Sequence, residues 1–306
     1  MIEIKNVTKK YGDFIAIKDV NITVKNCSVL GIAGYNGAGK TTLLRVCAGV
    51  FEADEGEVLL DGSNAFDNDK ERAGMFYLPD DMFFPHNATV KSSAKYYAGY
   101  FPSFDFAVFK KILELFGLTD EKMKIRSLSK GMKRQLCLAI AFAVKPKYLL
   151  IDETFDGLDP QKKNYLKNML LEYINQTNAS VIICSHDLSQ IAEVCDHIVL
   201  LNGKTVKLSC PIEEISDNFR SVKAEFEQSI SKEMFEIINH KNINISGKQV
   251  SLLIYGDIES EKTKIKNLGG NITEENFLTL EEVFSLETGS SSAVEISDIF
   301  NTEKEN

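Results

Sequence analysis

A glycine-rich loop at residues 34–41 constrains the fold of this chain more than any other feature. It reads Gly-Tyr-Asn-Gly-Ala-Gly-Lys-Thr and matches the phosphate-binding pattern G-x-x-x-x-G-K-[ST]. A continuous apolar run, residues 28–33, precedes the loop, and residues 42–46 continue it in a helical pattern. A strand buried on both faces, followed by a loop and a helix, is typical of a parallel sheet. The sequence therefore predicts an α/β fold with this loop at the end of a strand.

The residue types of the loop suit the binding of phosphate groups. Glycines let the backbone curl so that successive N–H groups point at phosphate oxygens, and the next helix offers its positive N-terminus. We expect Lys40 to reach the β- and γ-phosphates of a nucleotide and Thr41 to place its hydroxyl on Mg²⁺. The predicted nucleotide-binding residues of this segment are Asn36, Gly37, Ala38, Gly39, Lys40, Thr41 and Thr42.

Two further predicted strands end in polar side chains. The apolar run 148–151 ends in Asp152 and Glu153, and the run 180–184 is followed by His186. Ligands bind at the carboxyl ends of parallel strands, so Asp152 is expected to hold Mg²⁺. Strand side chains alternate, so Glu153 should point elsewhere and could act as general base on the attacking water. The imidazole of His186 could donate to a γ-phosphate oxygen. Each residue alone would more often be structural, but the nearby glycine loop favours the catalytic interpretation.

Composition excludes several classes of protein. The 35 basic residues against 44 acidic ones give a net charge of -9, so no general positive field attracts nucleic acid, and no nucleic-acid partner is expected. The longest charge-free apolar run, residues 136–144, is shorter than the roughly 20 residues that cross a bilayer. Residues 1–5 do not resemble a signal peptide. We expect a soluble chain that stays where it is made.

The pattern along the chain predicts two domains. Residues 1–217 form an α/β domain that begins with antiparallel lead-in strands in short stretches (2–4, 16–17 and 20–24). A helical subdomain is expected at about 80–145, including a helix over Asp105–Gly117. Residues 218–306 are expected to form a small α+β accessory domain, with a strand at 250–255 and a Ser-rich acidic tail, and show no catalytic constellation.

Residues 128–135, Leu-Ser-Lys-Gly-Met-Lys-Arg-Gln, resemble the signature motif of ATP-binding cassette (ABC) ATPases. The other motifs of that family follow in family order over residues 1 to about 217. They are the aromatic residue Tyr11, the phosphate-binding loop, the Asp152-Glu153 pair, the D-loop Gly157-Leu158-Asp159, and His186. The resemblance implies a P-loop NTPase core of the ABC type, with a mixed sheet and a helical subdomain. It also implies an ATPase that uses ATP and Mg²⁺.

The resemblance assigns roles that the residues alone do not reveal. It implies that Ser129 and Gly131 bind the terminal phosphate of ATP held by a second ABC ATPase subunit, identical or different. Two cassettes would then close head to tail around two nucleotides. Tyr11 would lie against the adenine ring, and Asp159 would belong to the composite site.

This chain departs from the family pattern at several positions. Asp80 stands where the family often has a Gln that contacts Mg²⁺ and water, so Asp80 is expected near the metal and the reaction. Thr154 replaces the usual Pro. Lys130 and Met132 replace the commoner Gly and Gln of the signature, a variant that resembles bacterial ABC-2 exporter-type proteins with separate membrane subunits. Residues 277–284 resemble the C-terminal extension of that group, although a simple amphipathic helix with Leu280, Val283 and Phe284 in its core explains them equally well.

These observations lead to one principal expectation. The chain would be the ATP-hydrolysing subunit of an ABC exporter, at the cytoplasmic face of the membrane, with separate transmembrane permease subunits. Residues 80–100 would grip a permease helix, unless the aromatic side chains are subdomain core; the relevant residues are Met82, Phe83, Phe84, Tyr96 and Tyr97. The alternatives are a soluble ABC ATPase acting on ribosomes or DNA, and a subunit that binds ATP without hydrolysing it. Intact Glu153 and His186 disfavour the last. The transported substrate cannot be read from the sequence.

Overall fold

The computed structural model describes residues 1–66, 68–153 and 158–288. The chain divides into two compact units, Met1–Ser209 and Cys210 onward. This division comes before the boundary predicted near residue 217, because α8 (Glu213–Asn218) packs against β11 (Phe219–Phe226) of the second unit. Each unit is described by itself.

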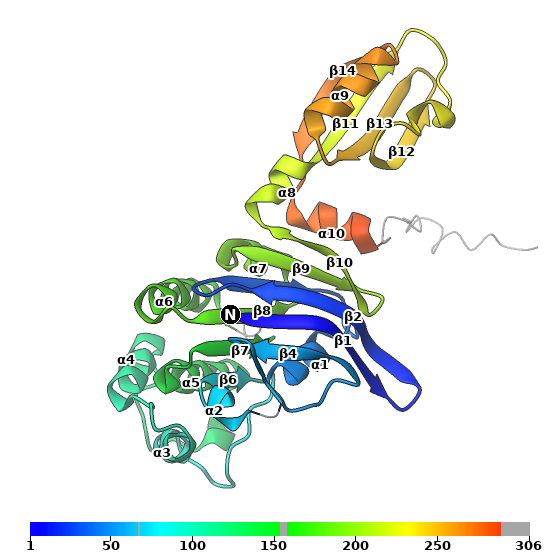
Figure 1. Cartoon of the computed structure of the whole chain (residues 1–306). Coiled ribbons are helices and arrows are strands. Elements are labelled where there is room, and N and C mark those ends of the chain that lie inside the picture. The colour runs from blue at the N-terminus through cyan, green and yellow to red at the C-terminus, as the bar shows by residue number, and fades with distance from the viewer. Residues whose placement is uncertain (67, 154–157, 289–306) are drawn as a thin grey trace, which may run out of the picture. The chain divides into compact units, whose positions relative to one another are not determined.

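The first unit begins with an antiparallel sheet of order β2-β1-β4-β5 (Figure 1). Its strands are β1 (Ile2–Tyr11), β2 (Phe14–Val24), β4 (Glu55–Leu60) and β5 (Ser63–Asn64). The sequence predicts short stretches here, whereas β1 and β2 are long and paired as far as the turn. Register shifts after Ile4 and Val7 interrupt the alternation of buried side chains, which explains why the sequence pattern looked broken.

A second sheet of six strands has the order β10-β9-β3-β8-β7-β6. Its strands are β3 (Val29–Ala33), β6 (Met75–Leu78), β7 (Tyr148–Asp152), β8 (Ser180–Ser185), β9 (His197–Asn202) and β10 (Thr205–Pro211). The neighbours from β9 to β6 are parallel. Every residue of β3, β7 and β8 is buried, as the continuous apolar runs in the sequence predict.

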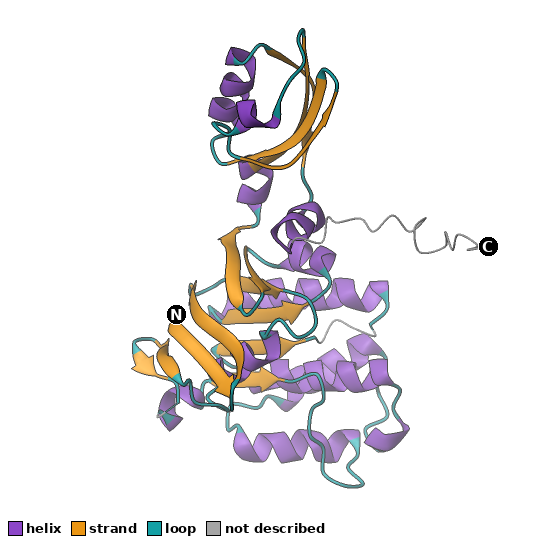
Figure 2. Ribbon diagram, turned by 90° about the vertical axis from the view of Figure 1, so that its right-hand side faces the viewer, coloured by secondary structure: helices purple, strands orange, loops and turns teal. Residues whose placement is uncertain are grey.

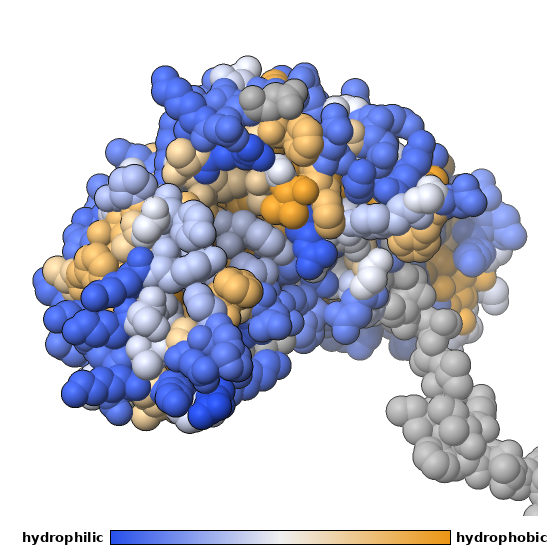
Figure 3. All heavy atoms as spheres, turned by 90° about the horizontal axis from the view of Figure 1, so that it is seen from below, coloured by the Kyte–Doolittle hydropathy of each residue, from blue (hydrophilic) through white to orange (hydrophobic). Residues whose placement is uncertain are grey.

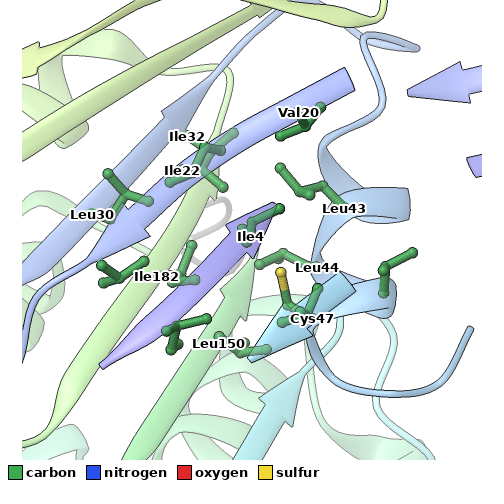
Figure 4. Packing of buried hydrophobic residues seen from close by; sticks show 14 of the residues in the cluster. Ile4, Val20, Ile22, Leu30, Ile32, Leu43, Leu44, Cys47, Leu150 and Ile182 are labelled. Atoms are coloured by element: carbon green, nitrogen blue, oxygen red, sulfur yellow. The ribbon is translucent and has the colours of Figure 1, made fainter. Parts of the chain in front are cut away.

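Figure 2 shows helices lying against the strands of the first unit, and the helix α1 and both sheets share a hydrophobic core (Figure 4). The helix α1 contributes Leu43, Leu44 and Cys47, the antiparallel sheet contributes Ile4, Val20 and Ile22, and the second sheet contributes Leu30, Ile32, Leu150 and Ile182. The helices of this unit are α1 (Lys40–Cys47), α2 (Asp69–Arg72), α3 (Val90–Tyr100), α4 (Phe106–Phe116), the 3₁₀ turn η1 (Ile125–Ser127), α5 (Lys130–Val144), α6 (Pro160–Thr177) and α7 (Leu188–Val194).

The segment between β6 and β7 is helical, and the helix predicted over residues 105–117 is present as α4. The helix α4 begins after Asp105, whose carboxylate accepts hydrogen bonds from two backbone N–H groups, and it ends at Gly117 in the left-handed conformation with φ 73°. Its apolar stripe, apart from exposed Phe106, is buried. Capping residues and helical spacing therefore specify this helix from local sequence.

The second unit is an α+β fold around an antiparallel sheet of order β12-β13-β11-β14. Its elements are α8, β11, the 3₁₀ turn η2 (Lys232–Phe235), β12 (His240–Ser246), β13 (Gln249–Tyr255), α9 (Ile258–Asn267), β14 (Gly270–Phe277) and α10 (Leu280–Thr288). The helix α9 packs against the sheet and closes a core that includes Val222, Leu252, Ile254 and Ile265. The strand predicted at 250–255 is β13, and Leu280, Val283 and Phe284 of α10 are buried.

Candidate functional site

The central strands of the parallel sheet end at one edge. Because β3, β8 and β7 are neighbours and parallel, the glycine loop after β3, Glu153 after β7 and His186 after β8 meet there. A cavity of about 480 Å³ lies at this edge. It is lined by Tyr11, Phe14, Ala16, Asn36, Gly37, Gly39, Lys40, Thr41, Thr42, Asp80, Lys130, Glu153 and His186.

Two glycines of the loop have different reasons to be glycine. Gly39 has φ 104°, and a Cβ there would lie 2.4 Å from Cγ2 of Ile17 and 2.7 Å from the carbonyl oxygen of Ala16. Gly37 has φ 83° with no atom near the position of a Cβ, so only its conformation requires glycine. The helix α1 starts at Lys40 directly after the loop, and no side chain of the described residues caps it. Its first N–H groups therefore suit an anion.

A chain of polar contacts joins three of the predicted residues. The Nζ of Lys40 lies 3.3 Å from Oε1 of Glu153, and Nδ1 of His186 lies 2.8 Å from Oε2 of the same carboxylate. Lys40 also donates to the carbonyl oxygen of Gly34 at 2.7 Å, and its side chain is almost fully buried. The imidazole of His186 is half-exposed. One carboxylate thus connects the lysine of the loop to the histidine of the neighbouring strand end.

The position of Glu153 has a different cause from the one predicted. The sequence suggests that strand alternation turns Glu153 away from Asp152, but β7 ends at Asp152 and Glu153 takes a left-handed conformation with φ 50°. Its N–H donates to the carbonyl oxygen of Cys184 at 3.0 Å. A glutamate at positive φ is held there by its surroundings at an energetic cost, as is common at functional sites.

Asp152 is a buried carboxylate with oxygen-rich neighbours. Burial raises the pKa of Asp152, while hydrogen bonds with Thr41 and Tyr77 oppose that shift. The hydroxyl of Tyr77 donates to Oδ2 of Asp152 at 3.2 Å, and burial raises the pKa of Tyr77 to about 12. The hydroxyl of Thr41 lies beside the carboxylate of Asp152. Oxygen atoms of these two kinds are typical protein ligands of Mg²⁺, whose remaining ligands are phosphate oxygens and waters. The two residues therefore fit the metal predicted from the sequence.

Sequence reasoning missed Tyr77 and Phe14. Tyr77 lies in β6, which pairs with β7, the strand that ends at Asp152. A tyrosine within an otherwise apolar predicted strand was the sequence signal that could have identified it. Phe14 pairs across the β1–β2 turn with Tyr11, and both line the cavity. The ring of Tyr11 meets the ring of Phe51 edge-on at 5.9 Å, and Nζ of Lys204 lies 4.3 Å from the centre of the Phe14 ring. The turn thus presents two aromatic side chains rather than one.

Several predicted residues do not reach this cavity within one chain. Ser129 caps α5 by accepting from the N–H of Met132 at 3.2 Å, and Asp159 caps α6 by accepting from the N–H of Lys162 at 3.0 Å. The described residues that line the cavity do not include Ser129, Asp159, Gly131 or Ala38. The N–H of Ala38 instead donates to the carbonyl oxygen of Tyr35 at 3.1 Å. Thr154 and Gly157 lie outside the described residues.

Asp80 lies on the wall of the cavity, but its carboxylate is already engaged. It forms an ion pair with the guanidinium of Arg134 in α5, and Arg134 also donates to the carbonyl oxygen of Asp80. The sequence predicts Asp80 near the metal and does not single out Arg134.

A second cavity of about 640 Å³ adjoins the segment after β6. Its apolar lining includes Met82, Phe84, Pro85, Ala88, Ile125 and Cys137, and its polar lining includes Asp80, Asp81, His86, Asn87, Arg126, Lys130, Lys133 and Arg134. Of the aromatic residues predicted here, Phe83 is mostly exposed, whereas Tyr97 packs against Phe76 and Phe84 and donates to the carbonyl oxygen of Phe83 at 2.6 Å. The segment therefore combines subdomain core with an exposed aromatic surface.

Comparison with known proteins identifies the family. Residues 17–156 match the family described as ABC transporter. The ABC transporter ATP-binding protein YtrB of Bacillus subtilis (strain 168) is 27% identical over 94% of this chain and 98% of that protein. A probable sulfate/thiosulfate import ATP-binding protein CysA of Chlorella vulgaris is 34% identical over 71% of this chain and 94% of that protein. The solved structure of an ATP-binding subunit of an ABC transporter has a TM-score of 0.65 and 25% identity, and the match covers 71% of this chain and 92% of that one.

These matches confirm the predicted P-loop NTPase fold of the ABC type and the transport class among the alternatives. Within the described residues, no helix has the length and apolar character needed to cross a membrane. ABC ATP-binding subunits of this kind work with transmembrane permease partners. The chain belongs to the ABC transporter family, as an ATP-binding subunit whose ATPase activity is coupled to transport.

Proposed function

We propose that this subunit hydrolyses ATP at the cavity beside residues 34–42, with Glu153 as the general base. The observation that supports this proposal is the contact of one carboxylate with both Lys40 and His186, at 3.3 Å and 2.8 Å. In-line attack of water on a terminal phosphate needs a base beside the groups that bind that phosphate. Glu153 would have this position, because it contacts Lys40 and His186.

Each remaining residue then has a role that its surroundings suit. A bound triphosphate would draw Lys40 away from Glu153 and from the carbonyl oxygen of Gly34, which leaves Glu153 to accept a proton from water. His186 would donate to a terminal phosphate oxygen. Thr41 and Asp152 would hold Mg²⁺, which when bound neutralises charge on the phosphates. Tyr11 would lie against the adenine ring.

We further propose that two cassettes close head to tail, so that Ser129, Gly131 and Asp159 serve the nucleotide of a second subunit. Of the signature segment, among the described residues, only Lys130 lines the cavity of its own chain. The N-terminus of α5, where Ser129 is the capping residue, suits an anion from elsewhere. The triphosphate would then bridge two subunits, and loss of the terminal phosphate would remove the bridge.

The substitution Glu153→Gln tests both parts of this proposal. We expect turnover to fall about 100-fold or more, because a general base contributes about this much. ATP binding should persist, and a closed dimer should accumulate with ATP and Mg²⁺, as measured by size-exclusion chromatography with light scattering. Glu193→Gln is the matched control, since Glu193 is an exposed helical glutamate that pairs with Lys167 at 3.8 Å. A Glu153→Gln variant that stays monomeric at saturating ATP and Mg²⁺ contradicts the composite site.

We propose that the second cavity and the aromatic surface beside it contact a permease at the cytoplasmic face of the membrane. Phe83 and Tyr100 expose 65% and 68% of their surfaces, and the ring of Tyr96 lies between them at 5.9 Å and 5.1 Å. Arg126, Lys130 and Lys133 have no acidic partner among the described residues. Figure 3 views the molecule from below, where apolar patches lie between hydrophilic side chains. The cavity lining combines apolar side chains with four Lys and Arg residues against two Asp residues, which suits a short helix that carries carboxylates.

Replacement of both exposed aromatic residues tests this surface. Phe83→Ser with Tyr100→Ser should release the subunit from membranes that hold its permease, while ATP binding by the isolated chain persists. Phe106→Ser is the control, because Phe106 is 45% exposed on α4 and lines neither cavity. Retention of the double variant on the membrane, equal to that of the control, would refute this contact.

We propose export as the direction of transport. The signature variant with Lys130 and Met132, and residues 277–284, resemble the exporter group, and the relative matched over 94% of the chain has no direction in its name. Other relatives are named for import: the CysA relative matches over 71% of the chain, and the methionine import ATP-binding protein MetN of Clostridioides difficile (strain 630) matches over 85%. In proteoliposomes with the ATPase outside, ATP should drive solutes of a cell extract into the lumen, with Glu153→Gln as control. ATP-dependent loss of solutes from preloaded vesicles would indicate import instead.

A further inference from the structure

Arg134 is a buried cation in the helix α5. Its side chain is only 5% exposed, and the residues that follow it in α5 are buried through Val144. A buried guanidinium is costly unless it is paired and hydrogen-bonded. The burial of Arg134 is therefore tolerated only because its guanidinium has partners.

Among the described residues, the hydrogen-bond and ion-pair partners of Arg134 are both atoms of one residue, Asp80. The guanidinium pairs with the carboxylate of Asp80 and donates to the carbonyl oxygen of the same residue. Asp80 comes two residues after β6, so these contacts fix the backbone of this segment as well as the side chain. An Arg that holds a main-chain oxygen and a carboxylate together constrains position more closely than a single ion pair does.

Asp80 lies on the wall that the two cavities share. It lines the nucleotide cavity together with Lys40 and Glu153, and it lines the second cavity together with Arg134. Lys130, one turn before Arg134 on α5, also lines both. A displacement of α5 would therefore move the side of the nucleotide cavity that Asp80 forms.

We propose that Arg134 is a positioning residue, which holds Asp80 at the shared wall and makes turnover at Glu153 depend on the place of α5. This inference rests on the proposed function of the nucleotide cavity. The pair acts as one unit, so loss of either member has the same consequence as loss of both. Asp80 acts through its fixed place beside Arg134 and does not ligate the metal.

A double-mutant cycle on the full chain tests this proposal. Asp80→Asn, Arg134→Gln and the double variant should each lower kcat by about the same factor, roughly tenfold, because residues that act as a unit are not additive. KM for ATP and the Mg²⁺ concentration at half-maximal rate should stay within about twofold. Arg134→Lys, which keeps the charge, should restore part of the rate and supplies a folded variant if Arg134→Gln is unstable.

A second ion pair of the same helix provides the matched control. Lys145, the C-cap of α5, lies 2.7 Å from the carboxylate of Asp105 and lines neither the nucleotide cavity nor the second cavity. Lys145→Gln and Asp105→Asn should leave kcat unchanged. Two results would overturn the proposal: multiplicative losses in the cycle, or a Mg²⁺ requirement that rises about tenfold in Asp80→Asn but not in Arg134→Gln. The second result would make Asp80 a metal ligand.

Hydrogen exchange gives a readout that needs no turnover. Arg134→Gln should increase amide exchange across residues 80–88 by about tenfold relative to Lys145→Gln, since local opening becomes easier when the contact is lost. Unchanged exchange there would count against the proposal even if kcat falls. If the wild-type chain fails to hydrolyse ATP while exchange responds as expected, the proposed function fails and the positioning contact stands.

Discussion

The two units are built by similar local rules, yet among the described residues only the first unit brings reactive side chains together in one cavity. In Met1–Ser209 the neighbouring strands β3, β8 and β7 are parallel, so the segments that follow them meet at one edge. In the second unit the strands are antiparallel, and successive strand ends lie at opposite edges. Strand direction therefore decides whether residues far apart in sequence can form one site.

The charged residues of the two units differ in the same way. In the second unit they pair between neighbouring elements: Lys223 of β11 with Glu274 of β14 at 2.6 Å, and Lys262 of α9 with Glu275 of β14 at 2.8 Å. In the first unit, Lys40 and Glu153 pair at 3.3 Å where a ligand can separate them, because both line the cavity. We infer that the Lys40–Glu153 pair of the first unit serves chemistry, whereas the ion pairs of the second unit stabilise its fold.

The largest effect should come from Lys40→Ala. We expect ATP turnover to fall about 100-fold to 1,000-fold, because the charge on Nζ is lost from the phosphate site. The rate of phosphate release measures this loss. Lys264→Ala in the second unit is the control, since Lys264 also pairs with a carboxylate, that of Glu261 at 2.8 Å. Near-normal hydrolysis by Lys40→Ala would refute the assignment of the loop.

The next largest effect should come from Ile254→Ala, which should lower the stability of the second unit alone. Ile254 is fully buried in the core between the sheet and α9, so Ile254→Ala should lower the free energy of unfolding of that unit by about 2–4 kcal/mol. Calorimetry should show one transition at lower temperature, while turnover at a permissive temperature stays unchanged. A parallel loss of turnover would show that the two units do not behave separately.

A smaller effect is expected from His186→Ala. Turnover should fall about 10- to 100-fold with little change in ATP binding, because the imidazole would act on charge that develops during the reaction. His240→Ala in β12 is the matched control: its Nδ1 lies 2.9 Å from the carbonyl oxygen of Ile238, outside both cavities. A loss of ATP binding equal to the loss of kcat would give His186 a binding role instead.

The smallest effect should follow Tyr77→Phe. The hydroxyl of Tyr77 lowers the pKa of Asp152 against the rise caused by burial, so its removal raises that pKa further. The protonated carboxyl then persists to higher pH, and the acid limb of the pH–rate profile should move to higher pH. The Mg²⁺ requirement should rise about three- to tenfold. Tyr255→Phe in the second unit should change neither quantity.

Much of the first unit could be predicted because its signals are local. The loop at residues 34–41, the apolar runs of β3, β7 and β8 and the capped helix α4 each depend on neighbours along the chain. The long strands β1 and β2 were harder to predict, since bulges break their alternation. No sequence motif predicted the strands of the second unit's sheet, apart from β13.

The sequence by itself determined the glycine-rich loop at residues 34–41, the acidic strand end and the family, because residue type and spacing carry those properties. Only the tertiary structure decided that Glu153 touches both Lys40 and His186, that Tyr77 donates to Asp152, and that Arg134 holds Asp80. These contacts join residues that are distant in sequence. Their geometry depends on strand order and on a backbone angle at Glu153, which no local pattern encodes.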